Sequence, residues 1–189
     1  EFAVNKAVDW LFWTNALPRA PIRRFFATVK YAQAVLLGDA ATVAKQIAAI
    51  NGAHRGVERS RGYAIPAWAY RDVLFMLIDY GERAHRVVYG PMSARDRVGY
   101  WTLMRELGEE LHVEDLPADY PAYLAARRRH LQENTAHTAW TDQLYAAYRK
   151  DLGPLRMPLL LDLQASLVPD HVAGLLSLRR RAYMDRALR

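Results

Sequence analysis

A histidine, His54, interrupts the apolar face of a segment that is predicted to form a helix over residues 42–58. Apolar residues recur on that face at helical spacing, and position 54 completes the series formed by Val43, Ile47, Ile50 and Val57. An imidazole in apolar surroundings needs partners for its ring nitrogens, because an unpaired buried polar group costs about 1–3 kcal/mol. The partner of His54 is therefore another side chain, a backbone carbonyl or a metal ion. From this helix alone, a hydrogen-bonded core histidine is the favoured alternative.

A second candidate set lies on the preceding predicted helix, which covers residues 22–37. Arg24, Thr28 and Tyr31 share one ridge beside an apolar stripe that includes Phe25 and Phe26. Binding pockets for small molecules are mostly apolar with a few placed polar groups, so these three side chains could line one. Spacing alone favours the simpler alternative, in which Arg24 is exposed and the Thr28 hydroxyl bonds its own backbone.

Other motifs exclude several classes of enzyme. Glu109 and His112 form a single Glu-x-x-His pair, whereas a di-iron site in a helical bundle needs two such pairs and further glutamates. His54 and Glu58 do not form the His-Glu-x-x-His motif of metalloproteases, and no serine-hydrolase elbow, phosphate loop or dinucleotide fingerprint occurs. The remaining histidines are expected on helix surfaces, near helix ends or in loops: His85, His112, His130, His137 and His171.

The elements that must position these residues are all predicted to be helices. No stretch alternates with the period of two that a half-buried strand requires. Asp39 and Ser93 stand where helix N-caps are expected, and Gly38, Gly62 and Gly90 where helices end. The predicted helices cover 5–13, 22–37, 42–58, 67–89, 94–111, 122–133, 138–152, 155–167 and 169–187. Because the loops between them are short, we expect one compact all-α, multi-helix domain over residues 1–189.

The composition supports a folded domain without cysteine chemistry. Of 189 residues, 52% are hydrophobic, which is enough for a sizeable core. The absence of cysteine excludes disulfides, thiolate haem ligands and cysteine nucleophiles. No window approaches an uninterrupted apolar membrane span. The chain begins at Glu1 rather than Met, so we expect an N-terminal segment to be missing. We expect a cytoplasmic or peripheral membrane location, with secretion left open for that reason.

The net charge of +6 permits contact with anionic partners. Arginines cluster at 23–24, 127–129 and 179–181, and no nucleic-acid-binding motif accompanies them. We therefore expect solvated helix faces, with contact to lipid head groups as the second interpretation and no nucleic-acid partner.

The order of motifs resembles a known family. Arg24-x-x-x-Thr28 precedes a helix end at Gly38, and IAAINGAHRGVE, GYAIPAWAYRDVLFMLIDYGERA, YGPMSARDR, DLPADYPAYLAARRRHL, YRKDLGPLRMPLL and LQASLVP follow. Over residues 24–169 this succession resembles the haem b oxygenases that include bacterial latex-clearing proteins (rubber oxygenases) and the fungal ER-bound oxygenase MpaB. It is most similar to their small bacterial members. The resemblance implies an all-helical fold with a globin-like core.

The resemblance also implies roles for particular residues. His54 matches the histidine that is the proximal ligand of the haem iron, and Arg24 and Thr28 match functional pocket residues. Arg24 could instead hold a haem propionate, and Tyr31, about one turn on, is an alternative distal donor. Rubber oxygenases can place a lysine just before the threonine, but this chain has Ala27 there. Lysine-gated access to the iron and a rubber-type substrate are therefore not carried over.

The sequence thus predicts a haem b-dependent oxygenase that uses dioxygen on an apolar, olefinic or isoprenoid substrate. Arg24 and Thr28 are its predicted catalytic residues, His54 its metal ligand, and Arg24, Tyr31 and His54 its cofactor-binding residues. Two alternatives stay open: a non-catalytic haem sensor or carrier, and a helical interaction protein without cofactor at a membrane surface.

Overall fold

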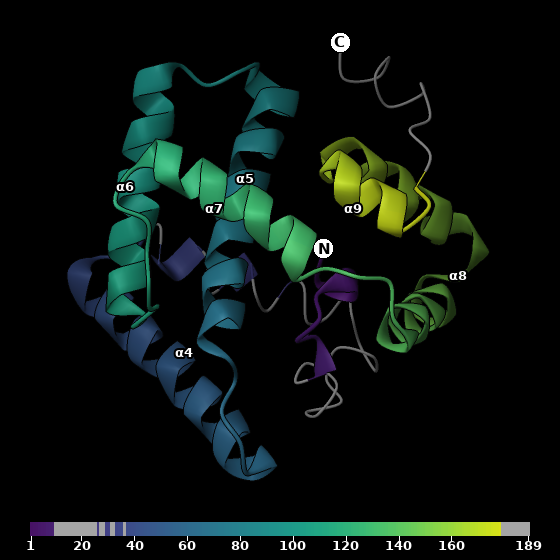
Figure 1. The fold of residues 1–189 in the computed structure, drawn as a ribbon, viewed down its shortest axis with the longest axis horizontal. Helices are drawn as coiled ribbons and strands as arrows, with labels where there is room; N and C mark the ends of the chain where they lie inside the picture. Colours follow the sequence, from purple (N-terminus) through teal and green to yellow (C-terminus); the bar gives the residue numbers. More distant parts are fainter. Residues whose placement is uncertain (10–25, 27–28, 31–32, 36, 179–189) are drawn as a thin grey trace.

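The computed structural model describes residues 1–9, 26, 29–30, 33–35 and 37–178 (Figure 1). Every regular element with described bounds is a helix, which confirms the predicted all-α class. One isolated antiparallel bridge joins Asn5 to Thr135. No described helix is both long and apolar enough to cross a membrane. The elements are η1 (Phe2–Val4), α4 (Ala40–Arg61), α5 (Ala67–Tyr89), α6 (Ala94–Glu110), α7 (Tyr120–Glu133), α8 (Ala139–Leu167) and α9 (Asp170–Leu175).

Local signals explain where several of these helices begin and end. The carboxylate of Asp39 accepts a hydrogen bond from Thr42 N at 2.8 Å and caps α4. Ser93 Oγ accepts one from Asp96 N at 3.1 Å and caps α6 in the same way. Gly62 ends α4 in the left-handed conformation, with φ of 78°, which glycine adopts without steric cost.

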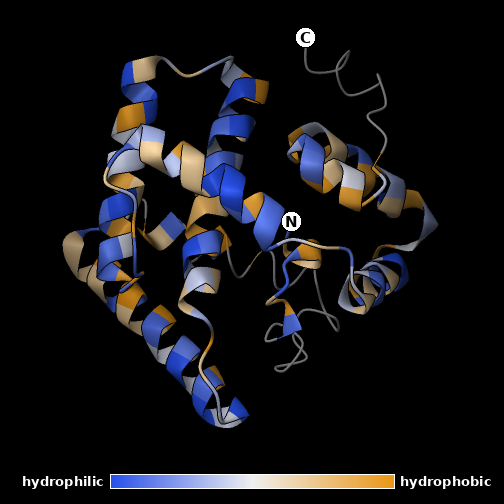
Figure 2. Cartoon of the chain, viewed as in Figure 1, coloured by the Kyte–Doolittle hydropathy of each residue, from blue (hydrophilic) through white to orange (hydrophobic). Residues whose placement is uncertain are grey.

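The main apolar core lies where α5, α6 and α7 meet. Phe75 and Ile78 of α5 pack with Trp101 of α6 and Tyr123 of α7. The rings of Trp101 and Tyr123 stack with centroids 4.9 Å apart. α5 and α6 run as an antiparallel pair, and α7 crosses them (Figure 1). Along these helices hydrophobic and hydrophilic positions alternate, as expected when one side of each helix is packed (Figure 2).

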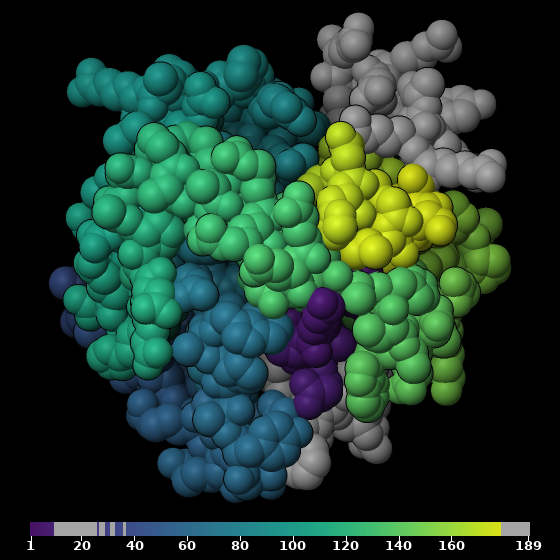
Figure 3. All heavy atoms as spheres, in the orientation of Figure 1, coloured from purple at the N-terminus to yellow at the C-terminus, as the bar shows by residue number. Residues whose placement is uncertain are grey.

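The N-terminal residues connect this core to the C-terminal helices. Val4 is fully buried against Leu131 of α7 and Val172 of α9. The hydroxyl of Thr141 on α8 donates a 2.5 Å hydrogen bond to Ala3 O. In the space-filling view the N-terminal residues lie between the surfaces of α5, α7 and α8 (Figure 3). The segment therefore packs between these helices, with Ala3, Val4 and Asn5 buried.

Two predicted helices differ from the observed ones. Residues 5–8 form a bridge and a turn in place of the start of a helix, because Asn5 pairs with Thr135. The final helix begins as predicted but ends at Leu175, since Ser177 adopts a left-handed φ of 52°. The break predicted near residue 153 is confirmed: α8 kinks at Gly153, where φ is 69°, just before Pro154. The predicted helix over 22–37 falls largely outside the described residues.

Candidate functional site

His54 lies near the C-terminal end of α4, on the side that meets α5. Its side chain is half-buried, and its ring centroid is 5.0 Å from that of Tyr70 on α5. The Tyr70 hydroxyl donates to Glu58 Oε1 at 3.1 Å, and Ile65 N donates to the same oxygen at 2.9 Å. Burial, together with the hydrogen bond to Glu58, raises the pKa of Tyr70. Tyr70 therefore stays protonated and is held by Glu58 beside the imidazole of His54.

The surroundings of His54 suit an imidazole that binds iron. Ile47, two turns earlier on the same face of α4, is buried, and Ile50 and Val57 are half-buried. A neutral imidazole nitrogen on an apolar wall is an ordinary haem ligand. The chemistry of this donor and its wall thus fits the predicted cofactor. The other predicted site residues, Arg24, Thr28 and Tyr31, lie outside the described residues, so their roles stay predictions.

A second group of polar residues is buried between α5, α7 and the N-terminus. We call it the ionic cluster; it comprises Glu1, Asp72, Asp79, Arg127 and His130. The Arg127 guanidinium, 4% exposed, contacts Glu1 at 2.5 and 2.6 Å and Asp79 at 2.9 and 3.1 Å. It also contacts Asp72 at 3.4 Å. Burial opposes the charged form, but the hydrogen bonds and charges of Glu1 and the aspartates raise the pKa of Arg127. This cation therefore stays charged inside the protein.

His130 connects the ionic cluster to a cavity. Its Nε2 lies against Asp72 Oδ1 in an ion-pair contact whose direction departs from that of a good hydrogen bond. Its Nδ1 is 2.8 Å from the amide nitrogen of Asn134 and accepts a hydrogen bond from that amide. Asn5 donates its side-chain amide to the other oxygen of Asp72. Burial raises the pKa of Asp72, and the contacts with His130 and Arg127 partly oppose that shift.

The carboxylates of Glu1 and Asp72 and the imidazole of His130 lie close enough together to hold a metal ion, with ligand atoms within 4.8 Å of one another. The Arg127 guanidinium, however, already contacts both carboxylates. A positive side chain in the position of the cation disfavours a metal there, because like charges repel strongly in a buried site. The ionic cluster is thus better explained as an ion-pair network.

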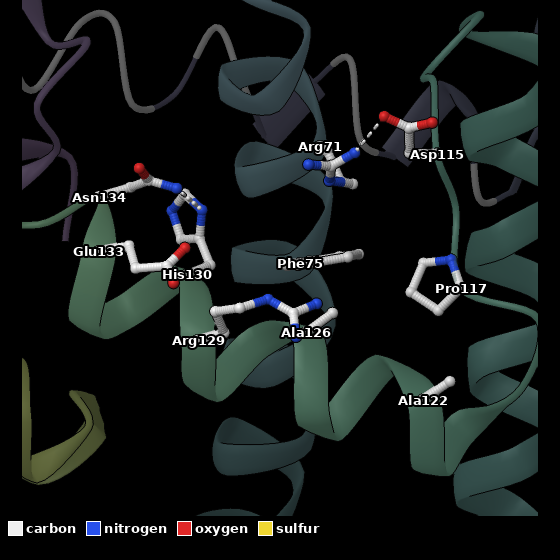
Figure 4. A pocket seen from close by; sticks show the side chains of 10 residues that line it. All are labelled: Arg71, Phe75, Asp115, Pro117, Ala122, Ala126, Arg129, His130, Glu133 and Asn134. Atoms are coloured by element: carbon white, nitrogen blue, oxygen red, sulfur yellow. Dashed lines mark hydrogen bonds and ion pairs between the residues drawn. The ribbon is translucent and has the colours of Figure 1, made fainter.

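The cavity is a pocket of about 380 Å³ between α5, α7 and the loop that joins α6 to α7 (Figure 4). This volume falls within the range of small-molecule sites. At one end Arg71 pairs with Asp115 at 3.0 Å, and at the other lie His130 and Asn134. The pocket is lined by Arg71, Phe75, Asp115, Pro117, Ala122, Ala126, Arg129, His130, Glu133 and Asn134.

The structure does not bring His54 and this pocket to the same face of α5. Tyr70 contacts His54, whereas Arg71 and Phe75 line the pocket. At 3.6 residues per turn, those two side chains leave the helix about 100° and 140° away from Tyr70. The chain therefore has two separate candidate sites.

Two sequence-based predictions were wrong around the second site. Arg127 was expected on a solvated face with Arg128 and Arg129, but only the latter two are exposed. His130 was expected in a solvated or capping role near a helix end, but it is 7% exposed. A signal was present: Asp72 and Asp79 stand on the face of α5 that carries the buried Ala69 and Met76. Carboxylates at core positions require buried partners, and the sequence did not identify them.

The comparisons with known proteins give one match. The family model described as ER-bound oxygenase mpaB/B'/rubber oxygenase, catalytic domain, matches residues 10–189. The comparison with curated proteins and the comparison with solved structures find no match. The matched span contains His54 and every residue that lines the pocket.

Proposed function

We propose that this chain, which belongs to the ER-bound oxygenase MpaB and rubber oxygenase catalytic-domain family, is a haem b-dependent oxygenase whose iron is held by His54. Membership of this family supports oxygenase chemistry. The single observation that supports His54 as the iron ligand is its position on the apolar side of α4. The proposed substrates are dioxygen and an apolar, olefinic or isoprenoid molecule.

The other five histidines lie in different surroundings. His130 is held by Asp72 and Asn134, and His137 by Leu175 O and Asp142. His85 Nδ1 lies 2.9 Å from Gly90 O, and His171 Nε2 lies 3.0 Å from the Thr135 hydroxyl. His112 is exposed beyond the end of α6. His54 is distinguished by its place on the face of α4 that carries Ile47, Ile50 and Val57.

When bound, haem would supply the activation of dioxygen, and the protein would supply position and electrostatics. Tyr70 restricts rotation of the His54 ring by packing against it, and Glu58 fixes Tyr70 through its hydroxyl. Arg24 and Thr28 are proposed to donate hydrogen bonds into the reaction pocket, with Tyr31 as an alternative donor. Arg24 could instead hold a propionate by a charge-assisted hydrogen bond.

The first test is reconstitution of the purified protein with haem, followed by its absorption spectrum. We expect a Soret band that is shifted or lost in His54→Ala and unchanged in His171→Ala. His171 is a matched control because it is an exposed histidine on another helix. A wild-type spectrum in the His54→Ala protein would reject His54 as the ligand. Oxygen uptake in the presence of apolar alkenes then distinguishes an oxygenase from a protein that binds haem without catalysing a reaction.

A further inference from the structure

We propose that the pocket between α5, α7 and the loop of residues 111–119 binds a small apolar molecule that carries a carboxylate, with Arg129 as its counter-ion. The proposal is independent of haem, because His54 of α4 contacts one face of α5 and the pocket is lined by another.

The wall of the pocket is suited to an apolar body. Phe75 lies beneath its floor: the ring is 1% exposed and is fixed by an edge contact with Tyr123, at a centroid distance of 5.3 Å. Ala122 and Ala126 stand one turn apart on α7, and their small side chains leave the space open. Pro117 covers the side toward the loop. An alkyl chain placed here would remove apolar surface of both partners from water.

The lining of the pocket carries two arginines and two carboxylates, and only one arginine is engaged in an ion pair among the described residues. Asp115 is engaged by Arg71 at 3.0 Å, so this pair closes one end with little net charge. Arg129 has no ion-pair partner among the described residues, and its side chain extends toward Phe75 and Ala126 (Figure 4). Glu133, the other carboxylate of the lining, stands one turn beyond Arg129 on α7, and both side chains are exposed. Arg129 is therefore the cation that a ligand can reach, and a guanidinium binds a carboxylate through two parallel hydrogen bonds.

The end of the pocket near His130 is rigid and polar. The His130 ring is held between Asp72 and Asn134, which fixes the Asn134 amide as well. One amide hydrogen of Asn134 serves His130, and the second remains for a ligand oxygen. Arg129 and Asn134 together can thus bind a carboxylate while its apolar body lies on Ala122, Ala126 and Pro117.

Binding can be measured calorimetrically on the full chain, with octanoate as the carboxylate and 1-octanol as its neutral analogue. We expect saturable binding of octanoate at least tenfold tighter than that of octanol. Arg129→Gln should weaken octanoate at least tenfold, and Arg128→Gln should not, because Arg128 is exposed on the same helix outside the lining. Ala126→Phe, which fills the pocket, should abolish binding. Ala122→Leu gives a second filling variant if Ala126→Phe fails to fold.

Four results would overturn the proposal. Equal affinity for octanoate and octanol, or an unchanged affinity in Arg129→Gln, would reject Arg129 as the counter-ion. Unchanged binding in a folded filling variant would place the ligand elsewhere. Loss of octanoate binding in His54→Ala would place it at the haem site, whereas unchanged binding there would leave this proposal standing whatever the fate of the haem assignment.

Discussion

The Asp72 carboxylate of α5 and the His130 imidazole of α7 form a buried contact that lies between the pocket and the guanidinium of Arg127. The two residues are far apart in the sequence, and their contact ties together the helices that line the pocket. Arg127 balances the charge of the buried carboxylates, including Glu1. Asn134 fixes the His130 imidazole through its Nδ1. The shape of the pocket therefore depends on the ionic cluster.

Replacing Arg127 with methionine should destabilise the protein strongly. The change leaves the Glu1, Asp72 and Asp79 carboxylates without their main cation, and breaking a buried ion pair on one side costs about 3–5 kcal/mol. The free energy of unfolding in urea measures the effect. Arg128→Met, at the exposed neighbouring position, should stay within about 0.5 kcal/mol of wild type. Equal unfolding midpoints for both variants would show that the cluster does not stabilise the fold.

Replacing Gly108 with alanine should also destabilise the protein, although alanine favours helices. A methyl group at Gly108 would lie 2.5 Å from a methyl carbon of Leu74, and such overpacking costs about 1–3 kcal/mol. Gly99→Ala, on the same helix with open space around it, should stabilise by up to about 1 kcal/mol. Thermal unfolding of the two variants should move in opposite directions. A stabilised Gly108→Ala protein would contradict the close packing of α5 and α6.

His137 should make stability depend weakly on pH. Hydrogen bonds to Leu175 O and to Asp142 raise its pKa above the usual 6.5. A raised pKa means that the folded state binds the proton more tightly, so the stabilisation is present below pH 6.5 and is lost as the pH rises through the folded value. Below pH 6.5, His137→Gln should therefore melt lower than wild type, and the difference should disappear as the pH rises through the folded pKa. Because the side chain is exposed, the difference should be on the order of 1 °C. A constant difference between the two proteins would exclude this role of His137.

Local signals were sufficient to predict much of the fold. Pro66 and Gly90 bound α5 at the predicted residues, and Asp39 and Ser93 cap the helices that follow them. These signals act over a few residues, so a sequence pattern contains them. His54 was found in the same way, as a polar residue within a periodic apolar face, and its helix is confirmed while its role as a ligand stays a prediction.

The second site could not be predicted because it depends on tertiary contacts. Arg127 stands in a run of three arginines, and only the crossing of α7 over α5 decides that it turns inward. The pocket takes its lining from two helices and a loop, none of which is unusual by itself. Asp72 gave a local hint as a carboxylate among apolar neighbours, but the identity of its partner was not in the local pattern.

The most direct test of the central claim uses His54→Gly reconstituted with haem, with and without added imidazole. If His54 binds the iron, the variant should lose the wild-type Soret spectrum, and free imidazole should restore it by occupying the vacated position. The same imidazole should leave the Arg128→Gln spectrum at its wild-type form. A His54→Gly protein that keeps the wild-type spectrum without imidazole would contradict the claim that His54 is the axial ligand.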